Sequence, residues 1–374
     1  MSVLRRWGLL VLTMTVACFA LKALAEDVAV DPVVVEGTAW YDAQKWPVEN
    51  KAWTDTARYF ARMPARAEGV VTANVWNLSQ HSAGELVRFR TNAPSISVKF
   101  KLYSASLAMP HMPATGVSGL DLYSKDTDGA WKWVACTQPT AVEATSALID
   151  GLDGTMREFL LYLPLYNGVD QLEIGVPEMA EFHAVAPRTE KPILYYGTSI
   201  AHGGCSSRPG NTFTAMLSRR LDLPVINLGF SGSARMEPEL AKLLAELDPC
   251  LFVIDASPNM GPELIDERGV GFVQILRDAH PETPILLVED RCYSNSWIIA
   301  SKADFHRRNH EALRRVFDHF AAAGDKNIYY LSAENLIGEN LDYDSTMDSS
   351  HLNDLGMYRM TDSLEKAIRP ILGK

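Results

Sequence analysis

The stretch ILYYGTSI, residues 193–200, sets the interpretation of the fold. Four apolar residues, typical of a buried strand, run into Gly197, and Thr198 and Ser199 follow. A serine on a glycine-flanked turn between a strand and a helix exposes its hydroxyl beside backbone N–H groups, as nucleophilic hydrolases require. An ordinary strand-to-helix loop with Ser199 as the helix N-cap has the same pattern. This stretch alone therefore leaves both interpretations open.

The alternation continues from here towards the C-terminal end. Strand-like apolar runs occupy residues 193–196, 225–228, 251–255, 285–289 and 328–331. Amphipathic helices are expected at residues 212–221, 238–247, 262–278, 303–323 and 355–372. Alternating strands and helices predict a parallel sheet with helices on both faces, and we assign this α/β domain to residues 189–374. Active sites in such sheets lie at the carboxyl ends of the strands.

Polar residues with suitable chemistry follow the later strands. The second strand leads into a glycine-containing loop that ends at Gly232, and the third is followed by the side-chain amide of Asn259. Asp348 and His351, three residues apart, precede the last helix. A histidine so placed can deprotonate a serine while the carboxylate fixes its tautomer.

These four blocks resemble the SGNH (GDSL-like) hydrolases, and the resemblance covers residues 192–372. It implies a flavodoxin-like hydrolase domain in which Ser199 is the nucleophile and Asp348 and His351 complete the triad. It further implies an oxyanion hole made by the backbone N–H groups of Ser199 and Gly232 and the amide of Asn259. Thr198 departs from the aspartate that usually precedes the nucleophile. We expect no cofactor and no metal, because a serine mechanism needs no Lewis acid.

The first half has a different pattern, with short strands broken by turns. Residues 86–91 and 96–102 are expected to form a hairpin-like pair, and further strands are expected at residues 131–136, 158–163 and 172–176. We therefore predict a β-sandwich or jelly roll over residues 26–188. The sequence GLDLY at residues 119–123 resembles the motif of the GxDLY domain, which precedes SGNH hydrolase domains in secreted bacterial proteins.

Residues 1–25 have the pattern of a secretory signal peptide. Arg5 and Arg6 precede an apolar run at residues 7–21, and Ala23-Leu24-Ala25 forms a small-residue cleavage site. We expect export to the periplasm or the exterior, with no membrane span after cleavage. A single-pass anchor is the alternative, although the run is shorter than the ~20 residues of a spanning helix. Lipoprotein anchoring through Cys18 is a further alternative.

Composition excludes several classes of protein. Of 374 residues, 47% are hydrophobic and 22% charged, which is typical of a globular chain and not of a disordered one. The formal charge is -11, and cleavage after residue 25 would make it 32 minus 46, or -14. A negative field repels phosphate backbones, so nucleic acid is not expected as a partner.

Three residues are candidates for substrate contacts. His202 lies too close to Ser199 on the same turn to serve as its base, so we expect a structural or pocket-lining role. Arg208 can bind an anionic group or pair with a local carboxylate. His111 lies in a segment rich in Pro, Met and small residues at 107–117, which we expect either to reach Ser199 or to brace the domain interface.

Two other groups of residues have simpler interpretations. His306 and His310 have metal-ligand spacing on a helix, but Arg307 stands where an HExxH motif needs glutamate, so a solvated helix face is expected. Six of the eight tryptophans lie in the first half, where core packing is the expected role and sugar stacking the alternative.

These features together predict an exported serine esterase that removes short acyl groups, O-acetyl above all, from carbohydrates. A lipid or thioester hydrolase is the alternative enzyme. A carbohydrate-binding protein with a vestigial hydrolase domain is the alternative from another class. The sequence does not indicate an oligomeric state.

Overall fold

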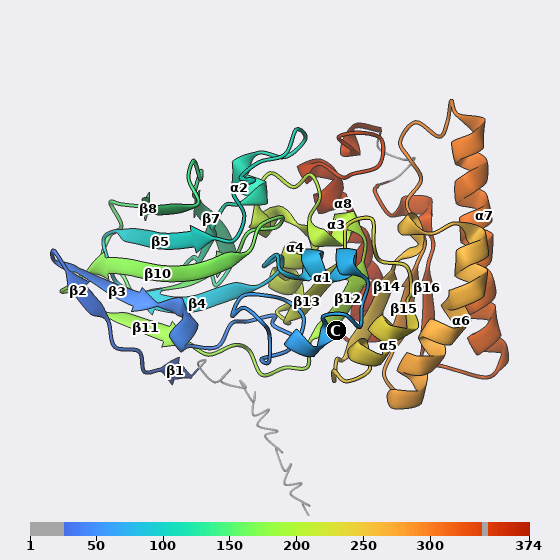
Figure 1. Cartoon of the computed structure of the whole chain (residues 1–374), viewed down its shortest axis with the longest axis horizontal. Helices are drawn as coiled ribbons and strands as arrows, with labels where there is room; N and C mark the ends of the chain where they lie inside the picture. Colours follow the sequence, from blue (N-terminus) through green and yellow to red (C-terminus); the bar gives the residue numbers. More distant parts are fainter. Residues whose placement is uncertain (1–25, 339–342) are drawn as a thin grey trace, which may run out of the picture.

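The computed structural model describes residues 26–338 and 343–374. It contains two antiparallel sheets in the first half of the chain and one parallel sheet in the second half, side by side along the long axis (Figure 1). The predicted signal peptide, residues 1–25, lies outside the described residues. Within the described residues, no helix is long and apolar enough to cross a membrane.

The antiparallel sheets form a β-sandwich, as the short alternating strands predict. One sheet has the order β1-β11-β4-β9-β6-β7 and the other the order β2-β3-β10-β5-β8. The strands are β1 (Asp27–Val28), β2 (Val33–Val35), β3 (Thr38–Asp42), β4 (Leu86–Thr91), β5 (Ile96–Leu102), β6 (Asp121–Lys125), β7 (Trp131–Cys136), β8 (Glu143–Ile149), β9 (Arg157–Tyr162), β10 (Val169–Pro177) and β11 (Phe182–Val185). Apolar side chains such as Phe89, Val98 and Phe159 fill the space between the sheets.

The expected hairpin of residues 86–91 and 96–102 is wrong, although both strands exist with those bounds. β4 pairs with β9 and β11, whereas β5 pairs with β8 and β10 in the opposite sheet. The link between them crosses the sandwich, and the side chain of Asn92 accepts a hydrogen bond from Glu181 N at 2.8 Å. Two apolar strands with a short linker can form either a hairpin within one sheet or an arch, in which the second strand joins the opposite sheet. Here both strands are buried against the same core from opposite sides, which favours the arch.

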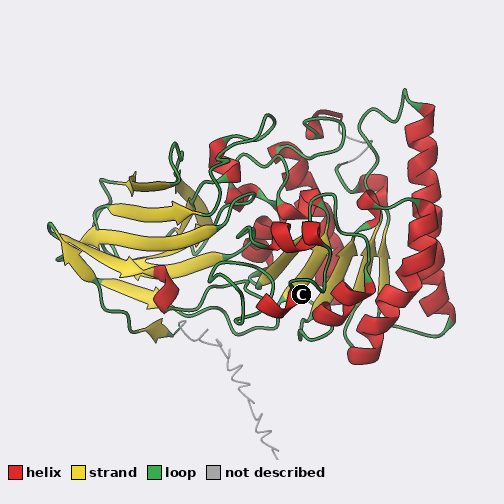
Figure 2. Ribbon diagram, in the orientation of Figure 1, coloured by secondary structure: helices red, strands yellow, loops and turns green. Residues whose placement is uncertain are grey.

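The second half is a parallel sheet of order β13-β12-β14-β15-β16, which confirms the predicted α/β class (Figure 2). Its strands are β12 (Ile193–Gly197), β13 (Val225–Gly229), β14 (Leu251–Asp255), β15 (Ile285–Val288) and β16 (Ile328–Leu331). Its helices are α3 (Ser199–His202), α4 (Phe213–Leu221), α5 (Pro238–Leu244), α6 (Pro262–Ala279), α7 (Ala300–Ala322) and α8 (Asp354–Ile371). All five strands point the same way, so their carboxyl ends share one edge.

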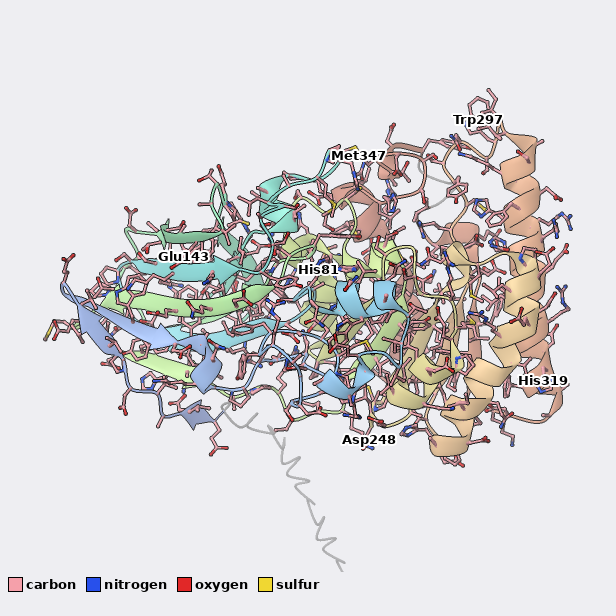
Figure 3. All side chains as sticks on the ribbon, viewed as in Figure 1. His81, Glu143, Asp248, Trp297, His319 and Met347 are labelled. Carbon is pink, nitrogen blue, oxygen red and sulfur yellow. The ribbon has the colours of Figure 1, made fainter. Side chains whose placement is uncertain are left out.

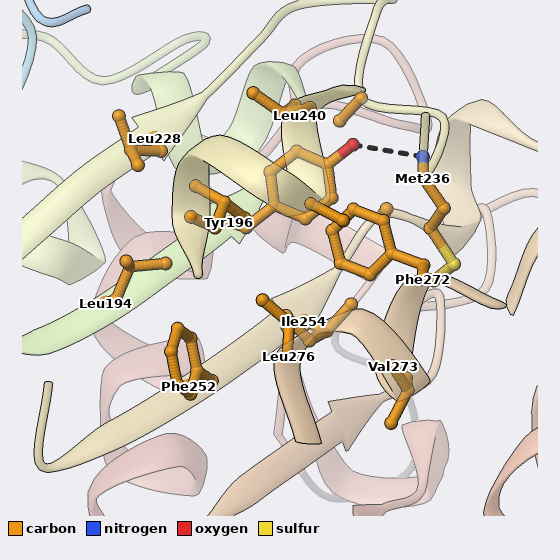
Figure 4. Packing of buried hydrophobic residues seen from close by; sticks show 14 of the residues in the cluster. Leu194, Tyr196, Leu228, Met236, Leu240, Phe252, Ile254, Phe272, Val273 and Leu276 are labelled. Carbon is orange, nitrogen blue, oxygen red and sulfur yellow. Dashed lines mark hydrogen bonds between the residues drawn. The ribbon is translucent and has the colours of Figure 1, made fainter. Parts of the chain in front are cut away.

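Alternate residues of each strand face opposite layers of helices. Leu194 and Tyr196 pack in the cluster that contains α5, α6 and α7 residues, while Ile193 and Tyr195 pack with α4 and α8. In the first cluster the rings of Tyr196 and Phe272 stack at 5.2 Å, and the buried Tyr196 hydroxyl accepts a hydrogen bond from the backbone N–H of Met236 (Figure 4). Helices therefore cover both faces of the sheet, and its carboxyl edge is where a functional site is expected.

Residues 49–82, which we call the arm, extend from the sandwich over the α/β domain. The arm ends in α1 (Ala73–Ser79), which lies beside β12 and β13 (Figure 1). Its Trp53, Met63 and Val75 belong to the same buried cluster as α5 and α6. The buried guanidinium of Arg62 donates to the carbonyl oxygens of Asn227 (3.2 Å) and Gly229 (2.9 Å) at the end of β13. The arm therefore completes the α/β core.

The GxDLY-type motif joins the two halves. Asp121 is fully buried, and its carboxylate accepts hydrogen bonds from Gly210 N (2.7 Å), the Arg208 guanidinium (3.0 Å) and Trp133 Nε1 (2.9 Å). The hydroxyl of Tyr123 also contacts the Arg208 guanidinium. The motif therefore holds the loop of residues 203–212, which follows α3, against the sandwich.

Candidate active site

Ser199 is the first residue of α3, at the carboxyl end of β12. The N-cap position belongs to Thr198, whose side chain makes no capping bond, so the structure differs from the alternative of Ser199 as an N-cap. Gly197 allows the tight turn, because a Cβ there would lie 2.8 Å from the Ala201 side chain and 3.2 Å from Asp255 O. The Ser199 side chain keeps only 9% exposure.

His351 lies within hydrogen-bond distance of both proposed partners. Ser199 Oγ is 2.8 Å from His351 Nε2, and His351 Nδ1 is 2.7 Å from Asp348 Oδ2. The second carboxylate oxygen of Asp348 accepts from His351 N (2.7 Å) and Ser350 N (3.0 Å). The three residues thus have the relative positions that a serine nucleophile, its base and an orienting carboxylate need.

Asp348 is held in its charged form. Partial burial acts to raise its pKa, but hydrogen bonds from the backbone and ring of His351 and from Ser350 N outweigh that effect and bring the pKa to about 2. An ionised carboxylate on Nδ1 fixes the His351 tautomer in which Nε2 accepts a proton from the serine.

The residues expected to form the oxyanion hole follow the first three strands of the parallel sheet at the same edge. Gly232 has φ +67°, and a Cβ there would meet open space. Asn259 is fixed by its carbonyl end, since its Oδ1 accepts from Ser233 N (3.1 Å) and Ala234 N (3.2 Å) in the orientation that satisfies the amide. This orientation leaves the Asn259 amide nitrogen as a donor. The oxyanion role of Ser199, Gly232 and Asn259 stays a prediction.

The sandwich contributes Tyr166, which the sequence analysis did not identify as a site residue. Its hydroxyl donates to the backbone carbonyl of Ser199 at 3.2 Å. Burial raises the pKa of Tyr166, which keeps the phenol protonated as a donor. A Cβ on Gly204 would lie 3.1 Å from the Tyr166 hydroxyl and 2.9 Å from Ser199 O, so the surroundings of the nucleophile are tightly packed. The sequence signal that could have identified Tyr166 as a site residue is a tyrosine in the turn at residues 166–168. This turn resembles many others, so the signal is weak.

His111 reaches the triad from the sandwich side. It is exposed, and its ring centroid lies 6.2 Å from that of His351. The loop is held by the backbone pair Met109 and Met112, and Met112 is buried against Cys205 and Tyr166 at the domain junction. The segment therefore both packs in the interface and places His111 beside His351.

His202 and Arg208 have other partners. His202 is fully buried, with its ring stacked on Tyr166 at 4.3 Å and its Nε2 3.3 Å from His81 Nδ1. Burial lowers the pKa of His202 well below its usual value, so a neutral ring packs beneath the nucleophile turn, and direct contact with substrate is excluded in this arrangement. Arg208 is paired with Asp121, the carboxylate alternative considered above.

The expectation of a solvated face for His306 and His310 is wrong. His306 is buried, its Nδ1 is 2.8 Å from Asp290 Oδ2, and its Nε2 accepts from Tyr293 N at 2.9 Å. His310 Nε2 lies 2.7 Å from Asp290 Oδ1. The Asp290 carboxylate, at the end of β15, stabilises both rings on the inner side of α7.

A metal would need some of the same atoms. Nitrogen atoms of His306 and His310 and the sulfur of Cys292 lie within 4.8 Å of one another. Both nitrogens of His306 are already used in hydrogen bonds to Asp290 and Tyr293, so binding an ion would disrupt this network. The arrangement fits a hydrogen-bonded cluster around Asp290 better than a preformed metal site.

Arg291, next to that cluster, supports the triad loop. It is buried, and its Nε and Nη2 donate to Ser350 O at 3.1 and 2.8 Å. The N–H of Ser350 in turn donates to Asp348. The Ser350 residue is thus held at both its N–H and its carbonyl, and His351 follows directly.

We expect Arg291→Met to lower kcat for p-nitrophenyl acetate by about tenfold or more, because the His351 loop loses its anchor. KM is expected to change little, since the hydrogen bonds of Arg291 go to the Ser350 carbonyl in that loop. Arg291→Lys retains one donor and should recover part of the loss. Equal falls in kcat and in the fraction of folded protein would assign Arg291 a purely structural role.

Comparisons with known proteins agree with this geometry. A family model described as GDSL-like lipase/acylhydrolase matches residues 190–369, and a model for the GxDLY N-terminus of SGNH-type esterases matches residues 38–182. A GDSL-like lipase structure from Bacteroides ovatus is 33% identical, with a TM-score of 0.84 over 90% of this chain and 98% of that one. This chain belongs to the GDSL-like (SGNH) lipase/acylhydrolase family. The family resemblance drawn from the sequence is therefore confirmed.

Two more distant structures share the fold of this SGNH family member. The salicylyl-acyltransferase SsfX3 is 20% identical, with a TM-score of 0.71 and coverage of 91% of this chain and 97% of that one. A family two carbohydrate esterase from Clostridium thermocellum is 14% identical, with a TM-score of 0.54 and coverage of 78% and 93%. The search of curated proteins found no match. The chain is an ester-hydrolysing enzyme of the SGNH class.

Proposed function

We propose that this enzyme removes short acyl groups, acetyl above all, from carbohydrate esters with a Ser199–His351–Asp348 triad. The observation that carries the proposal is the continuous hydrogen-bonded series from Ser199 Oγ through His351 to Asp348. His351 Nε2 takes the Ser199 proton as Oγ attacks the acyl carbon, and then gives it to the departing sugar hydroxyl. Water next attacks the acyl-enzyme with His351 again as base, which releases acetate and restores the serine.

One observation favours a small acyl group. Ser199 is nearly buried, so a long acyl chain at its Oγ would have to displace neighbouring atoms. The carbohydrate side of the proposal draws support from fold relatives, since the Clostridium thermocellum esterase structure was determined in complex with cellohexaose. We further propose that residues 1–25 direct the enzyme to the periplasm or the exterior.

The test is a chain-length series with p-nitrophenyl acetate, butyrate and octanoate, run beside acetate release from partially acetylated oligosaccharides. We expect kcat/KM to fall from acetate to octanoate, because a long chain has to displace packed atoms around Ser199. A higher kcat/KM for octanoate would favour the alternative of a lipid hydrolase. Failure of wild-type protein to react with a fluorophosphonate probe at Ser199 would favour a vestigial hydrolase domain.

We propose that His111 contacts the alcohol side of the substrate, since it is exposed beside His351. His111→Ala should raise KM for an acetylated oligosaccharide by about three- to tenfold, the size of one lost hydrogen bond. Activity on p-nitrophenyl acetate should change little. His319→Ala, which removes an exposed histidine at the far end of α7 (Figure 3), is the matched control. An unchanged KM for His111→Ala would leave the loop with only its role in the interface.

A further inference from the structure

Four large apolar side chains are exposed at the carboxyl edge of the parallel sheet. Trp297 and Ile298, just before α7, are 69% and 67% exposed, while Tyr343 and Met347, just before the triad loop, are 52% and 57% exposed. Figure 3 labels Trp297 and Met347 along the same upper side of the molecule. Large solvent-exposed apolar groups that gather at one place are a mark of a binding surface.

Trp297 and Tyr343 form the centre of this surface. Their ring centroids are 6.4 Å apart, and the planes meet at 68°. An edge-to-face contact of this kind fixes two rings relative to each other while leaving faces open to a ligand. Buried tryptophans of the sandwich, such as Trp40 and Trp46, show core packing instead, in line with the interpretation favoured for the first half.

Hydrogen bonds connect the segment that precedes Trp297 to the loop that carries Asp348 and His351. Ser294 N donates to Ser349 O at 2.9 Å, and Ser294 Oγ lies 2.9 Å from Thr346 Oγ1. Met347 N donates to His351 O at 2.8 Å. A ligand on the pair therefore lies against the same loops as the substrate of Ser199.

We propose that Trp297 and Tyr343 form a sugar-binding platform that holds units of the glycan next to the esterified one. This inference rests on the proposed function. The acyl carbon must reach the nearly buried Ser199, so the alcohol part of the ester points outward toward exposed groups. The C–H faces of a sugar ring are apolar and pack on aromatic rings, while its hydroxyl groups remain available for hydrogen bonds.

Polar groups around the pair favour a sugar over an acyl chain. Lys302 Nζ lies 2.9 Å from Asn295 Oδ1 and 3.4 Å from Ser349 Oγ, so ammonium, amide and hydroxyl groups lie on the segments that flank the two rings in the chain. A long acyl chain or an apolar face of a second protein copy would bury these groups without replacing their bonds to water, which costs free energy. Sugar hydroxyl groups replace those bonds.

The first experiment compares Trp297→Ala and Tyr343→Ala with wild type on p-nitrophenyl acetate and on acetylated cello-oligosaccharides of increasing length. We expect KM for the longer oligosaccharides to rise about five- to tenfold in each variant, the size of one ring contact, with kcat/KM for p-nitrophenyl acetate unchanged. Trp297→Phe should keep part of the affinity. Tyr358→Ala, which removes an equally exposed aromatic ring on α8, is the matched control.

The second experiment measures binding without turnover. Ser199→Ala protein is titrated with unacetylated cellohexaose while tryptophan fluorescence is recorded. The fluorescence change on binding should disappear in the double variant that carries both Ser199→Ala and Trp297→Phe. Binding of cellohexaose through Trp297 without acetate release by the wild-type enzyme would support the platform. The same result would overturn the proposed substrate. Acetate release with unchanged KM in Trp297→Ala would overturn the platform alone. A rise in KM for p-nitrophenyl octanoate, or a change in oligomeric state, would also overturn it.

Discussion

Ser199→Ala is expected to lower kcat/KM for p-nitrophenyl acetate by about 10³-fold or more. The variant keeps the donors around the acyl oxygen and the binding contacts but has no nucleophile, so only a residual rate remains. The side chain is small and nearly buried, and its Oγ contacts His351 Nε2, so folding should be preserved. Initial rates across substrate concentrations, with a thermal melt for each protein, give the measurement.

His351→Ala should cost about as much as Ser199→Ala, and the double variant should cost little more, because the two residues act as one unit. Asp348→Asn is expected to lose less activity, since the carboxylate orients the base without transferring the proton itself. Wild-type rates in Ser199→Ala would exclude this triad. A loss in Asp348→Asn equal to that in His351→Ala would show that ionisation of Asp348, with its pKa near 2, matters more than orientation.

Asp121→Ala should lower the free energy of unfolding by about 3–5 kcal/mol, as expected when one member of a buried ion pair is removed. Asp121 is fully buried and the side chain of Arg208 is 21% exposed, so the guanidinium would lose its carboxylate partner and keep only its contact with the Tyr123 hydroxyl. The N–H of Gly210 and the indole of Trp133 would lose their acceptor as well. Urea denaturation followed by circular dichroism measures the change.

Activity should fall together with this stability, because the loop of residues 203–212 begins beside Ser199. Asp121→Asn keeps an acceptor for Gly210 N and should lie between wild type and Asp121→Ala. Asp126→Ala, just past the other end of β6, removes an acid whose ion-pair partner, Lys132, is largely exposed, and its unfolding midpoint should lie closer to wild type than that of Asp121→Ala. Equal midpoints for the Asp121 and Asp126 variants would contradict the role of the motif as an interdomain clamp.

Much of the α/β domain could be predicted because its evidence is local. The strands at residues 251–255 and 328–331 have the predicted bounds, since a buried parallel strand is a continuous apolar run. Ser199, Asp348 and His351 could also be selected from the sequence as candidate site residues, because each follows a predicted strand or precedes a predicted helix. The geometry around His351 places all three within hydrogen-bond distance, as the family pattern implies.

The sequence analysis missed features that depend on contacts distant in the chain. Tyr166 touches Ser199 O only because the sandwich packs on the α/β domain, and a single tyrosine in a turn has no periodic pattern. The burial of His306 depends on Asp290, which lies on another element. The arch between β4 and β5 was misread as a hairpin, since a short linker does not reveal which sheet the next strand joins.

The arm of residues 49–82 has a consequence for the order in which the molecule matures. A chain made from its N-terminus presents Trp53, Met63 and Val75 long before α5 and α6, the helices that bury them, exist. The sandwich strands can pair early, but these side chains must remain in water or on a chaperone until α5 and α6 are made. Completion of the nucleophile site is therefore a late event, and a chain truncated within the α/β domain would expose the arm to proteases.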